Sequence, residues 1–540
     1  MNFSILKYTH YAKHKKMKYN TIIIGGGLAG LTAGAILAKF GKKVLLLEQH
    51  HKPGGCATTF KRGDFVIEAG LHEMSGLDEN GTLMQIFDML DVNQQVEFLQ
   101  VPEYYAVLSD RGKFVLPHGY DAATKALIDR YPEDENGIKR FMKLIASIRK
   151  EGVKLPRTPL KRKLMYPFMP LFYPNIVKAS RHTVGSWLDK YITNENAKLD
   201  LVAHIGYWGD DPYTLSMFYY GLPQSSYIKS GGHYIKGGSQ QLSNHLAAYI
   251  EKHNGSVLLG KKAERIVTNN GQVSAVTFRD SSNESLEAVT ISCDNVVANC
   301  AIPLVPDLLD EPHASSLKQQ IGSKTISCSL LCLYLGFKTD LEAFGVEHYS
   351  NVIEGDDVKT LKDVHPNQLG DWSKRSFVFV DYGKIDAQLA PPDKSVGAIC
   401  GVDYLKNWEG LSKDEYKAKK EEVAQVLLQR LEKQFPGIRE SVEYYEIATP
   451  KTMKRYTLNP DGTVYGFTQS IQQSGANRFR NNFSIPNLYF ASAWAFPGGG
   501  FEGAITGGFL TALQMNRDKI WSECDDAKFV DQRMVSLTNP

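Results

Sequence analysis

The feature that most constrains this chain is a glycine-rich turn between a buried strand and a helix. The apolar run 21–24 predicts a strand that is covered on both faces, as in a parallel sheet. The next elements follow in order: glycines at 25, 27 and 30, a helix over 28–40, a strand over 43–47, and Glu48. Strand, G-x-G-x-x-G turn, helix, strand and acid together predict an α/β dinucleotide-binding fold.

Each part of this motif has a physical role. Gly25 makes the tight turn, Gly27 lets the backbone approach a pyrophosphate, and Gly30 lets helix and strand pack closely. The helix N-terminus favours phosphate charge. Glu48 can accept hydrogen bonds from an adenosine ribose. We therefore expect cofactor contacts from Gly25, Gly27, Leu28, Ala29, Gly30, Glu48 and Gln49.

Two further glycine clusters lie far from the first. Gly54 and Gly55 follow Glu48 closely and precede Cys56. Near the other end, 487–493 predicts a buried strand. A second G-x-G-x-x-G, a run of three glycines at 498–500 and Gly503, then precedes a helix over 504–515. No second strand ending in an acid follows it, so we do not interpret this motif as a second nucleotide fold.

Composition excludes several classes of protein. The chain has 540 residues, 43% hydrophobic and 22% charged, with a net charge of +3. This composition does not suit a disordered chain, and 62 basic against 59 acidic residues does not suit a nucleic-acid-binding protein. The sequence contains no run of 18 or more apolar residues, so we expect no membrane-spanning helix. The seven cysteines form no CxxC pair, so we expect no disulfide framework, no metal site and a reducing, cytoplasmic compartment.

The middle of the chain continues the nucleotide-binding pattern. The glycine-rich run 231–239 leads into a helix that Ser239 is expected to cap and that runs to about residue 253. Asn-Asn-Gly at 269–271 predicts a hairpin. We expect a backbone contact to the adenine side of the cofactor at Ile266. The predicted strands here cover 257–267, 273–278 and 296–299.

The segments 78–228 and 312–450 are less patterned and predict a substrate domain made from two insertions. Ser412 and Glu415 predict a capping box at the start of one amphipathic helix. Aromatic residues either line a tunnel for an elongated apolar substrate here or form ordinary core. They are Tyr207, Trp208, Tyr213, Phe218, Tyr219, Tyr220, Tyr227 and Tyr234.

Residues 154–178 combine six basic side chains with interleaved aromatic and aliphatic residues and no acid. This composition favours docking to an anionic membrane surface, where a lipid substrate could enter. An irregular lid packed on the domain is the alternative. The first sixteen residues predict a basic tail, with Met17 as an alternative start.

These motifs resemble a family of FAD-dependent oxidoreductases that includes carotenoid desaturases, carotenoid isomerases and retinol saturases. The resemblance is closest to the retinol saturase-like branch. In place of the tyrosine that follows the histidine in the saturase pattern, this chain has Glu73, which leaves the substrate open. The matching segments are 48–50, 54–56, 70–72, 236–239 and 497–503.

The resemblance implies a Rossmann-like FAD-binding domain, of the glutathione-reductase and amine-oxidase type, interleaved with a mixed α+β substrate domain. In this family the glycine doublet passes close to the flavin, and the C-terminal glycine loop closes the flavin site. A helix N-terminus there would favour the negative charge of the reduced flavin. The implied cofactor residues are Gly54, Gly55, Cys56, Gly499, Gly500, Gly503 and Ala504.

The expected domains are discontinuous because the glycine clusters serve one cofactor. The FAD-binding domain comprises 17–77, 229–311 and 451–525. The substrate domain comprises 78–228 and 312–450. The segments 1–16 and 526–540 are expected to be tails.

The resemblance implies a redox step on a C=C bond of a conjugated polyene or isoprenoid lipid, most simply by a saturase or reductase. NADH or NADPH is the candidate electron donor. Hydride would add to one carbon, and an acid would protonate the other. The candidate acids are His72, Glu73, Tyr234 and Glu502.

Three alternatives stay open. A carotenoid desaturase or cis-trans isomerase would keep the fold and change the chemistry. A protein of the GDP-dissociation-inhibitor type would bind prenyl lipids without catalysis. An amine oxidase of the same superfamily would consume oxygen with amines. The sequence leaves the oligomeric state open.

Overall fold

The computed structural model describes residues 17–78, 81–155, 164–283 and 285–516. The predicted tails 1–16 and 526–540 lie outside the described residues, as do residues 156–163 of the predicted membrane-facing segment.

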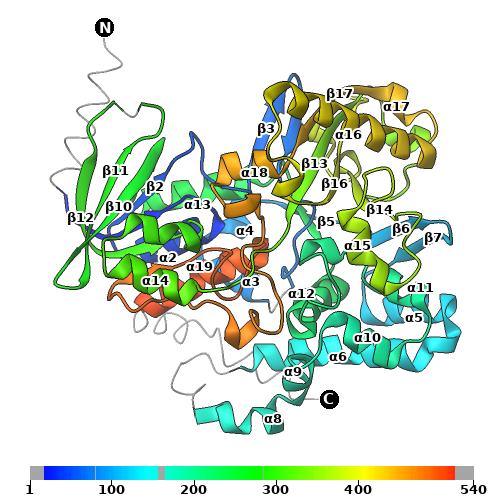
Figure 1. Ribbon diagram of the computed structural model, residues 1–540, viewed down its shortest axis with the longest axis horizontal. Helices are drawn as coiled ribbons and strands as arrows, with labels where there is room; N and C mark the ends of the chain where they lie inside the picture. Colours follow the sequence, from blue (N-terminus) through cyan, green and yellow to red (C-terminus); the bar gives the residue numbers. More distant parts are fainter. Residues whose placement is uncertain (1–16, 79–80, 156–163, 284, 517–540) are drawn as a thin grey trace.

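The first of two large sheets holds the strands predicted around the glycine turn (Figure 1). Its order is β10-β11-β12-β1-β2-β9, and β18 pairs with β12. Ile22 of β1 lies opposite Leu45 of β2 and Val296 of β12, and both pairings are parallel. The strands are β1 (Tyr19–Ile24), β2 (Val44–Glu48), β9 (Ser256–Leu259), β10 (Lys261–Asn269), β11 (Gln272–Asp280), β12 (Val289–Ala298) and β18 (Leu488–Phe490).

Three local predictions need correction. The predicted strand 257–267 is two strands, because the chain turns at Gly260 with φ +67°. The predicted strand 487–493 shortens to β18, because β12 ends at Ala298 opposite Phe490. Ser239 precedes its helix as predicted, but its hydroxyl donates to Glu68 instead of capping the helix. The predicted hairpin at 269–271 is confirmed.

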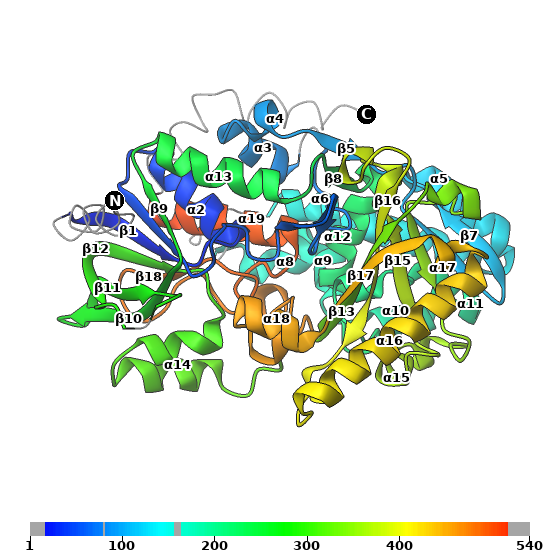
Figure 2. The same ribbon diagram turned by 90° about the horizontal axis from the view of Figure 1, so that it is seen from above.

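Three helices pack together beside the first sheet (Figure 2). They are α2 (Leu28–Lys39), α13 (Gln240–Lys252) and α19 (Phe501–Met515). A Cβ on Gly508 of α19 would lie 2.3 Å from the carbonyl oxygen of Ala29, so only glycine allows α19 to cross α2 this closely. The crossing brings the start of α2 next to α19. The shorter α3 (Thr82–Met89) and α4 (Val92–Gln95) pack in the same core.

The second large sheet has the order β17-β13-β16-β15-β14-β6-β7. Leu331 and Leu333 of β13 pack against α16 (Lys413–Gln434), whereas Cys332 and Tyr334 point to the opposite face, as strand alternation requires. The predicted capping box at the start of α16 is confirmed. The strands are β6 (Tyr105–Ser109), β7 (Gly112–Leu116), β13 (Ser329–Phe337), β14 (Ser350–Ile353), β15 (Phe377–Asp381), β16 (Ser395–Asp403) and β17 (Val442–Ala448).

A helical layer completes the second half of the molecule. Its main members are α5 (Tyr120–Arg130), α6 (Glu135–Val153), α10 (Val184–Tyr191) and α12 (Met217–Ser230), which share one core with β6 and β7. Two short sheets, β3 (Thr59–Arg62) with β4 (Phe65–Glu68) and β5 (Phe98–Gln100) with β8 (His233–Ile235), complete the strands used below. Within the described ranges, no helix is both long and apolar enough to cross a bilayer.

Candidate functional site

A large cavity runs from the first glycine turn to the inner face of the second sheet. Its volume is about 2090 Å³. Ordinary small-molecule sites occupy roughly 300–1,000 Å³, so there is room for a cofactor together with an elongated substrate. The three glycine clusters at 25–30, 54–55 and 498–503 all contribute to its wall.

The first glycine turn is held in a conformation that larger residues could not adopt. Gly25 has φ +103°, and a Cβ on Gly30 would lie 2.4 Å from the Gly25 carbonyl oxygen. The amide of Asn299 donates to the carbonyl oxygens of Gly25 and Gly27 at 3.0 and 3.2 Å. Sequence reasoning missed Asn299, although its place directly after a buried strand of the same sheet was a signal. No side chain caps α2, so its first N–H groups remain available to a phosphate.

Glu48 is buried at the end of β2 and fixes the same turn. One carboxylate oxygen accepts the Gly26 N–H at 2.6 Å, and the other accepts the His50 N–H at 2.7 Å. A Cβ on Gly26, the middle glycine of the motif, would lie 3.0 Å from this carboxylate and would crowd it. Each carboxylate oxygen has a further lone pair, and Glu48 lines the cavity.

The glycine doublet packs directly on the first turn. The Gly54 N–H donates to the Gly26 carbonyl oxygen at 2.8 Å. A Cβ on Gly54, where φ is +127°, would lie 2.2 Å from the Ala57 carbonyl oxygen. The Cys56 side chain opens into the cavity but is enclosed by protein, and this burial raises the pKa of its thiol to about 11.

The C-terminal glycine loop forms the start of α19. Gly500 has φ +80° and begins the helix at Phe501, three residues before the predicted start. A Cβ on Gly503 would lie 2.8 Å from the Gly498 carbonyl oxygen. No side chain caps α19 either. Two uncapped helix N-termini therefore face one cavity, an arrangement suited to an anionic cofactor.

Comparison with known proteins agrees with this geometry. Residues 28–516 match the family model of flavin containing amine oxidoreductases, which is most of the chain. The chain belongs to this family. It is therefore an FAD-dependent oxidoreductase, and the predicted family and fold class are confirmed.

Two curated relatives of this flavin oxidoreductase align along almost its whole length. All-trans-retinol 13,14-reductase of Danio rerio is 24% identical over 93% of this chain and 87% of the relative. Prolycopene isomerase of Daucus carota is 24% identical over 93% of this chain and 81% of the relative. Among solved structures, cyclohexylamine oxidase of Brevibacterium oxydans has a TM-score of 0.59 at 17% identity, covering 94% of this chain and all of the other.

The residues at the cradle fit FAD, because tight glycine turns and two uncapped helix N-termini meet at one cavity. The predicted cofactor residues outside β10 all line this wall or brace it: 25, 27–30, 48–49, 54–56, 499–500 and 503–504. Ile266 has its side chain in the core and does not line the described cavity wall, so the backbone contact expected there stays a prediction. The first three residues of the same strand, Lys261, Lys262 and Ala263, line the cavity, because β10 starts at the cavity edge.

The predicted aromatic cluster divides into two groups. Tyr213, Tyr220 and Tyr234 lie away from the described cavity wall; Tyr220, for example, packs against Trp208 and Phe141. The others line the cavity: Tyr207, Trp208, Phe218, Tyr219 and Tyr227. The predicted cluster therefore contains both cavity-lining and core-packing residues, and its role as a substrate tunnel stays a prediction.

The four candidate acids differ in position and in protonation. Burial lowers the pKa of His72 to about 4, so its ring is neutral at neutral pH and is a weak acid. Tyr234 is fully buried against Tyr382 and does not reach the described cavity wall. Glu502 accepts a hydrogen bond from Ser75 at 2.6 Å, and burial raises its pKa. Glu73 lines the cavity with a carboxyl that has no hydrogen-bond partner among the described residues.

A buried carboxyl that sequence reasoning did not single out braces the cavity wall. Glu68 is 1% exposed and accepts hydrogen bonds from the Ser239 N–H and hydroxyl, both at 2.8 Å, and from the N–H groups of Gly70 and Leu71. It therefore ties β4 to the start of α13. Despite these donors, burial raises the pKa of Glu68 to about 7.

This pKa predicts a pH dependence of stability. Between the ordinary carboxyl pKa of 4.5 and about 7, the folded protein keeps the Glu68 proton while the unfolded chain has lost it. The free energy of unfolding therefore falls by about 3 kcal/mol as pH rises through this window, at roughly 1.4 kcal/mol per pH unit. Urea unfolding of Glu68→Gln from pH 4.5 to 8 is expected to lack this fall. The exposed Glu97→Gln is the control. If the free energy of unfolding of Glu68→Gln fell with pH as steeply as that of this control, the raised pKa of Glu68 would be refuted.

Proposed function

We propose that this oxidoreductase reduces a C=C bond of an apolar conjugated polyene or isoprenoid lipid. The observation that carries the proposal is the single cavity that joins the FAD cradle to a chamber with mostly apolar, aromatic walls. The two curated relatives act, by name, on a retinoid and on a carotenoid. Both are elongated polyenes, and such a chamber suits them.

The chain's own residues would bind, orient and shield the substrate. The residues at 25–30, 48, 54–55 and 499–504 would hold FAD, whose reduced form supplies a hydride when bound. The aromatic wall would exclude water and align the polyene. Glu73 would keep a proton facing the substrate, because burial raises its pKa well above its ordinary value. NADH or NADPH is proposed as the source of electrons.

A visible spectrum followed by anaerobic titration with NADPH, NADH and dithionite tests the cofactor and its donor. We expect a flavin spectrum that a nicotinamide bleaches. A protein bleached by dithionite alone would remove the nicotinamide from the proposal. A colourless protein that cannot be reconstituted with FAD would favour the non-catalytic prenyl-lipid-binding alternative.

A second candidate function is amine oxidation, which the family and the similarity to cyclohexylamine oxidase favour. Oxygen consumption on adding amines would support it. Desaturation and isomerisation of a polyene are distinguished from reduction by analysing the product formed without oxygen. Reduction adds two hydrogens, desaturation removes two, and isomerisation changes the double-bond geometry at constant mass.

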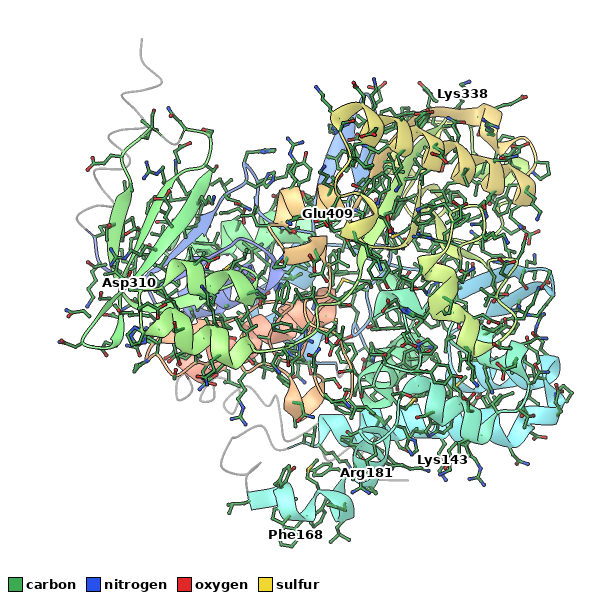
Figure 3. All side chains as sticks on the ribbon, viewed as in Figure 1. Lys143, Phe168, Arg181, Asp310, Lys338 and Glu409 are labelled. Atoms are coloured by element: carbon green, nitrogen blue, oxygen red, sulfur yellow. The ribbon has the colours of Figure 1, made fainter. Side chains whose placement is uncertain are left out.

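We also propose that the segment around α8 (Met169–Phe172) docks on an anionic membrane. Figure 3 shows Phe168 at the end of a projection away from the body of the molecule. The large apolar and aromatic side chains of this segment are 53% to 74% exposed. They are Leu164, Tyr166, Phe168, Leu171 and Phe172. Lys178 and Arg181 follow shortly afterwards. Lys154 and Leu155, just before the segment, line the cavity, so a lipid could enter beside the docking site.

Replacing two of these exposed side chains is expected to weaken membrane binding. Each large apolar residue that enters the bilayer interface contributes up to roughly 1.5–3 kcal/mol. The double variant Phe168→Ser, Leu171→Ser should therefore bind vesicles containing phosphatidylserine at least about tenfold more weakly in a sedimentation assay. Tyr445→Ser, which removes an exposed aromatic ring from β17, is the matched control. Equal binding by both variants would contradict docking through this segment.

A further inference from the structure

Three polar groups in the cavity wall lack hydrogen-bond partners within the described part of the chain. They are the carboxyl of Glu73, the hydroxyl of Tyr207 and Nδ1 of His204. The side chains of Glu73 and His204 are 0% and 1% exposed. All three residues line the cavity. Unpartnered polar atoms at this depth are uncommon in folded proteins and indicate a position that a ligand fills.

The surrounding structure fixes these groups in place. His204 Nε2 lies 3.2 Å from the Ser350 hydroxyl, and its Nδ1 lies 3.8 Å from a Glu73 carboxyl oxygen, which is too far for a hydrogen bond. The Tyr207 ring packs on the His204 ring at 4.5 Å between centroids. A Cβ on Gly232 would lie 1.6 Å from the other Glu73 oxygen, so glycine there makes room for this carboxyl.

All three groups are uncharged near neutral pH. Burial raises the pKa of Glu73 and of Tyr207 well above their ordinary values, and burial lowers the pKa of His204 well below its own. Glu73 therefore carries an O–H donor, and Tyr207 carries a second. A neutral carboxylic acid and a tyrosine in an apolar site form an effective pair of donors for an enolate oxygen.

We propose that Glu73 and Tyr207 bind the carbonyl oxygen of a substrate in which C=O is conjugated with the reduced C=C bond. This inference rests on the proposed function and names its substrate class, the polyene aldehydes and ketones. A polyene without that oxygen would offer these two donors no acceptor.

The same pair explains how such a bond could accept a hydride. When a C–H bond forms at the β carbon, the π electrons of the C=C bond move towards the carbonyl oxygen, which becomes an enolate oxygen. The enolate oxygen takes the Glu73 proton, and the enol then becomes the saturated carbonyl as the α carbon gains a proton from water and the oxygen returns its proton to Glu73. One hydride, from the reduced cofactor of the proposed function, and one proton are consumed.

The test uses the full FAD-loaded chain and three polyenes of one skeleton: all-trans-retinal, all-trans-retinol and the corresponding hydrocarbon. Difference infrared spectroscopy measures the C=O stretch of bound retinal, and mass spectrometry measures reduction. We expect the bound C=O stretch to lie below its value in an apolar solvent, and retinal to be reduced at least about 100-fold faster than the hydrocarbon. Tyr207→Phe should slow retinal reduction about 10²–10³-fold, a larger loss than the same variant shows with the hydrocarbon.

Three further variants separate hydrogen bonding from structure. Glu73→Gln keeps a donor of the same shape and should retain part of the infrared shift, whereas Glu73→Ala should lose it. Tyr213→Phe, which removes a phenol that donates to Asp189 away from the cavity, should behave as wild type.

The outcomes distinguish this inference from the proposed function. An unshifted C=O stretch, with retinal and hydrocarbon reduced equally fast, would overturn the inference and leave the proposed function standing. A shifted stretch that Tyr207→Phe and Glu73→Ala abolish, without reduction of any polyene, would support the carbonyl site and contradict the proposed function.

Discussion

Gly30→Ala is expected to abolish stable FAD binding. The added Cβ would lie 2.4 Å from the Gly25 carbonyl oxygen and 2.7 Å from the amide nitrogen of Asn299. Neither neighbour can yield cheaply, because one is backbone and the other braces the turn through two hydrogen bonds. The turn must open and withdraw its N–H groups from the pyrophosphate position. We expect at least a 100-fold loss of affinity for FAD, equivalent to about 2.7 kcal/mol.

The ratio of flavin absorbance to protein, together with a reconstitution titration, measures this loss. Gly209→Ala is the matched control, since its Cβ would meet only Leu215, at 3.9 Å. Circular dichroism establishes whether Gly30→Ala folds. If it does not, Asn299→Ala, which removes the brace and adds no bulk, is expected to lower affinity by about tenfold. Normal flavin content in folded Gly30→Ala would show that the cofactor does not use this turn.

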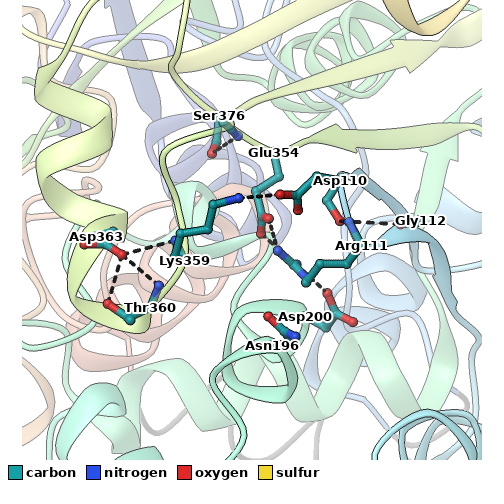
Figure 4. A network of polar contacts seen from close by, with 12 residues as sticks. Asp110, Arg111, Gly112, Asn196, Asp200, Glu354, Lys359, Thr360, Asp363 and Ser376 are labelled. Carbon is teal, nitrogen blue, oxygen red and sulfur yellow. Dashed lines mark hydrogen bonds and ion pairs between the residues drawn. The ribbon is translucent and has the colours of Figure 1, made fainter.

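Arg111→Ala is expected to destabilise the folded protein strongly. Figure 4 shows the Arg111 guanidinium between the carboxylates of Glu354 and Asp200. The side chains of Arg111, Glu354 and Asp200 are only 13%, 10% and 1% exposed. Asp200 keeps its ion pair with Arg130, but Glu354 loses the cation that it pairs with, and breaking a buried pair in this way costs roughly 3–5 kcal/mol. The change also removes the links from the β6–β7 turn to Glu354 and to Asp200 of α11 (Glu195–Leu201), while β6 stays paired with β14.

Chemical denaturation measures the free energy of unfolding of Arg111→Ala and of Lys359→Ala. The first variant breaks a buried ion pair and the second an exposed one, and Figure 4 shows both pairs. Lys359 and its partner Asp110 are 57% and 55% exposed, so losing that pair should cost less than about 1 kcal/mol. Burial already raises the pKa of Glu354 and of Asp200. Without Arg111 both carboxyls take up protons more readily, so the loss should be smaller at pH 5 than at pH 8. Equal losses for the two variants at both pH values would contradict this account.

The cofactor side of the molecule could be predicted from the sequence because its signals are local. Gly25, Gly30 and Glu48 lie within one strand-helix-strand unit, and the turn that they form depends on residues close in the chain. The sequence does not reveal contacts between residues that lie far apart along the chain. Asn299 braces Gly25 from 274 positions away, and Gly508 is needed only because Ala29 lies against it.

The substrate side was predictable only in outline. The aromatic residues near 207–227 were recognised, but periodicity alone did not separate those that line the cavity from those that pack in the core. The partner residues of Glu73 illustrate the reason. Tyr207, His204 and Gly232 come from different elements, and the charge state of Glu73 follows from burial among them. Burial of this kind depends on tertiary packing.

A single anaerobic turnover tests the central claim most directly. The FAD-loaded protein is reduced with dithionite, freed of excess reductant and mixed with one equivalent of all-trans-retinal. The account predicts that the flavin spectrum returns to the oxidised form as the polyene absorption shifts to shorter wavelength, with a product heavier by two hydrogens. A flavin that stays reduced beside retinal of unchanged mass would contradict it.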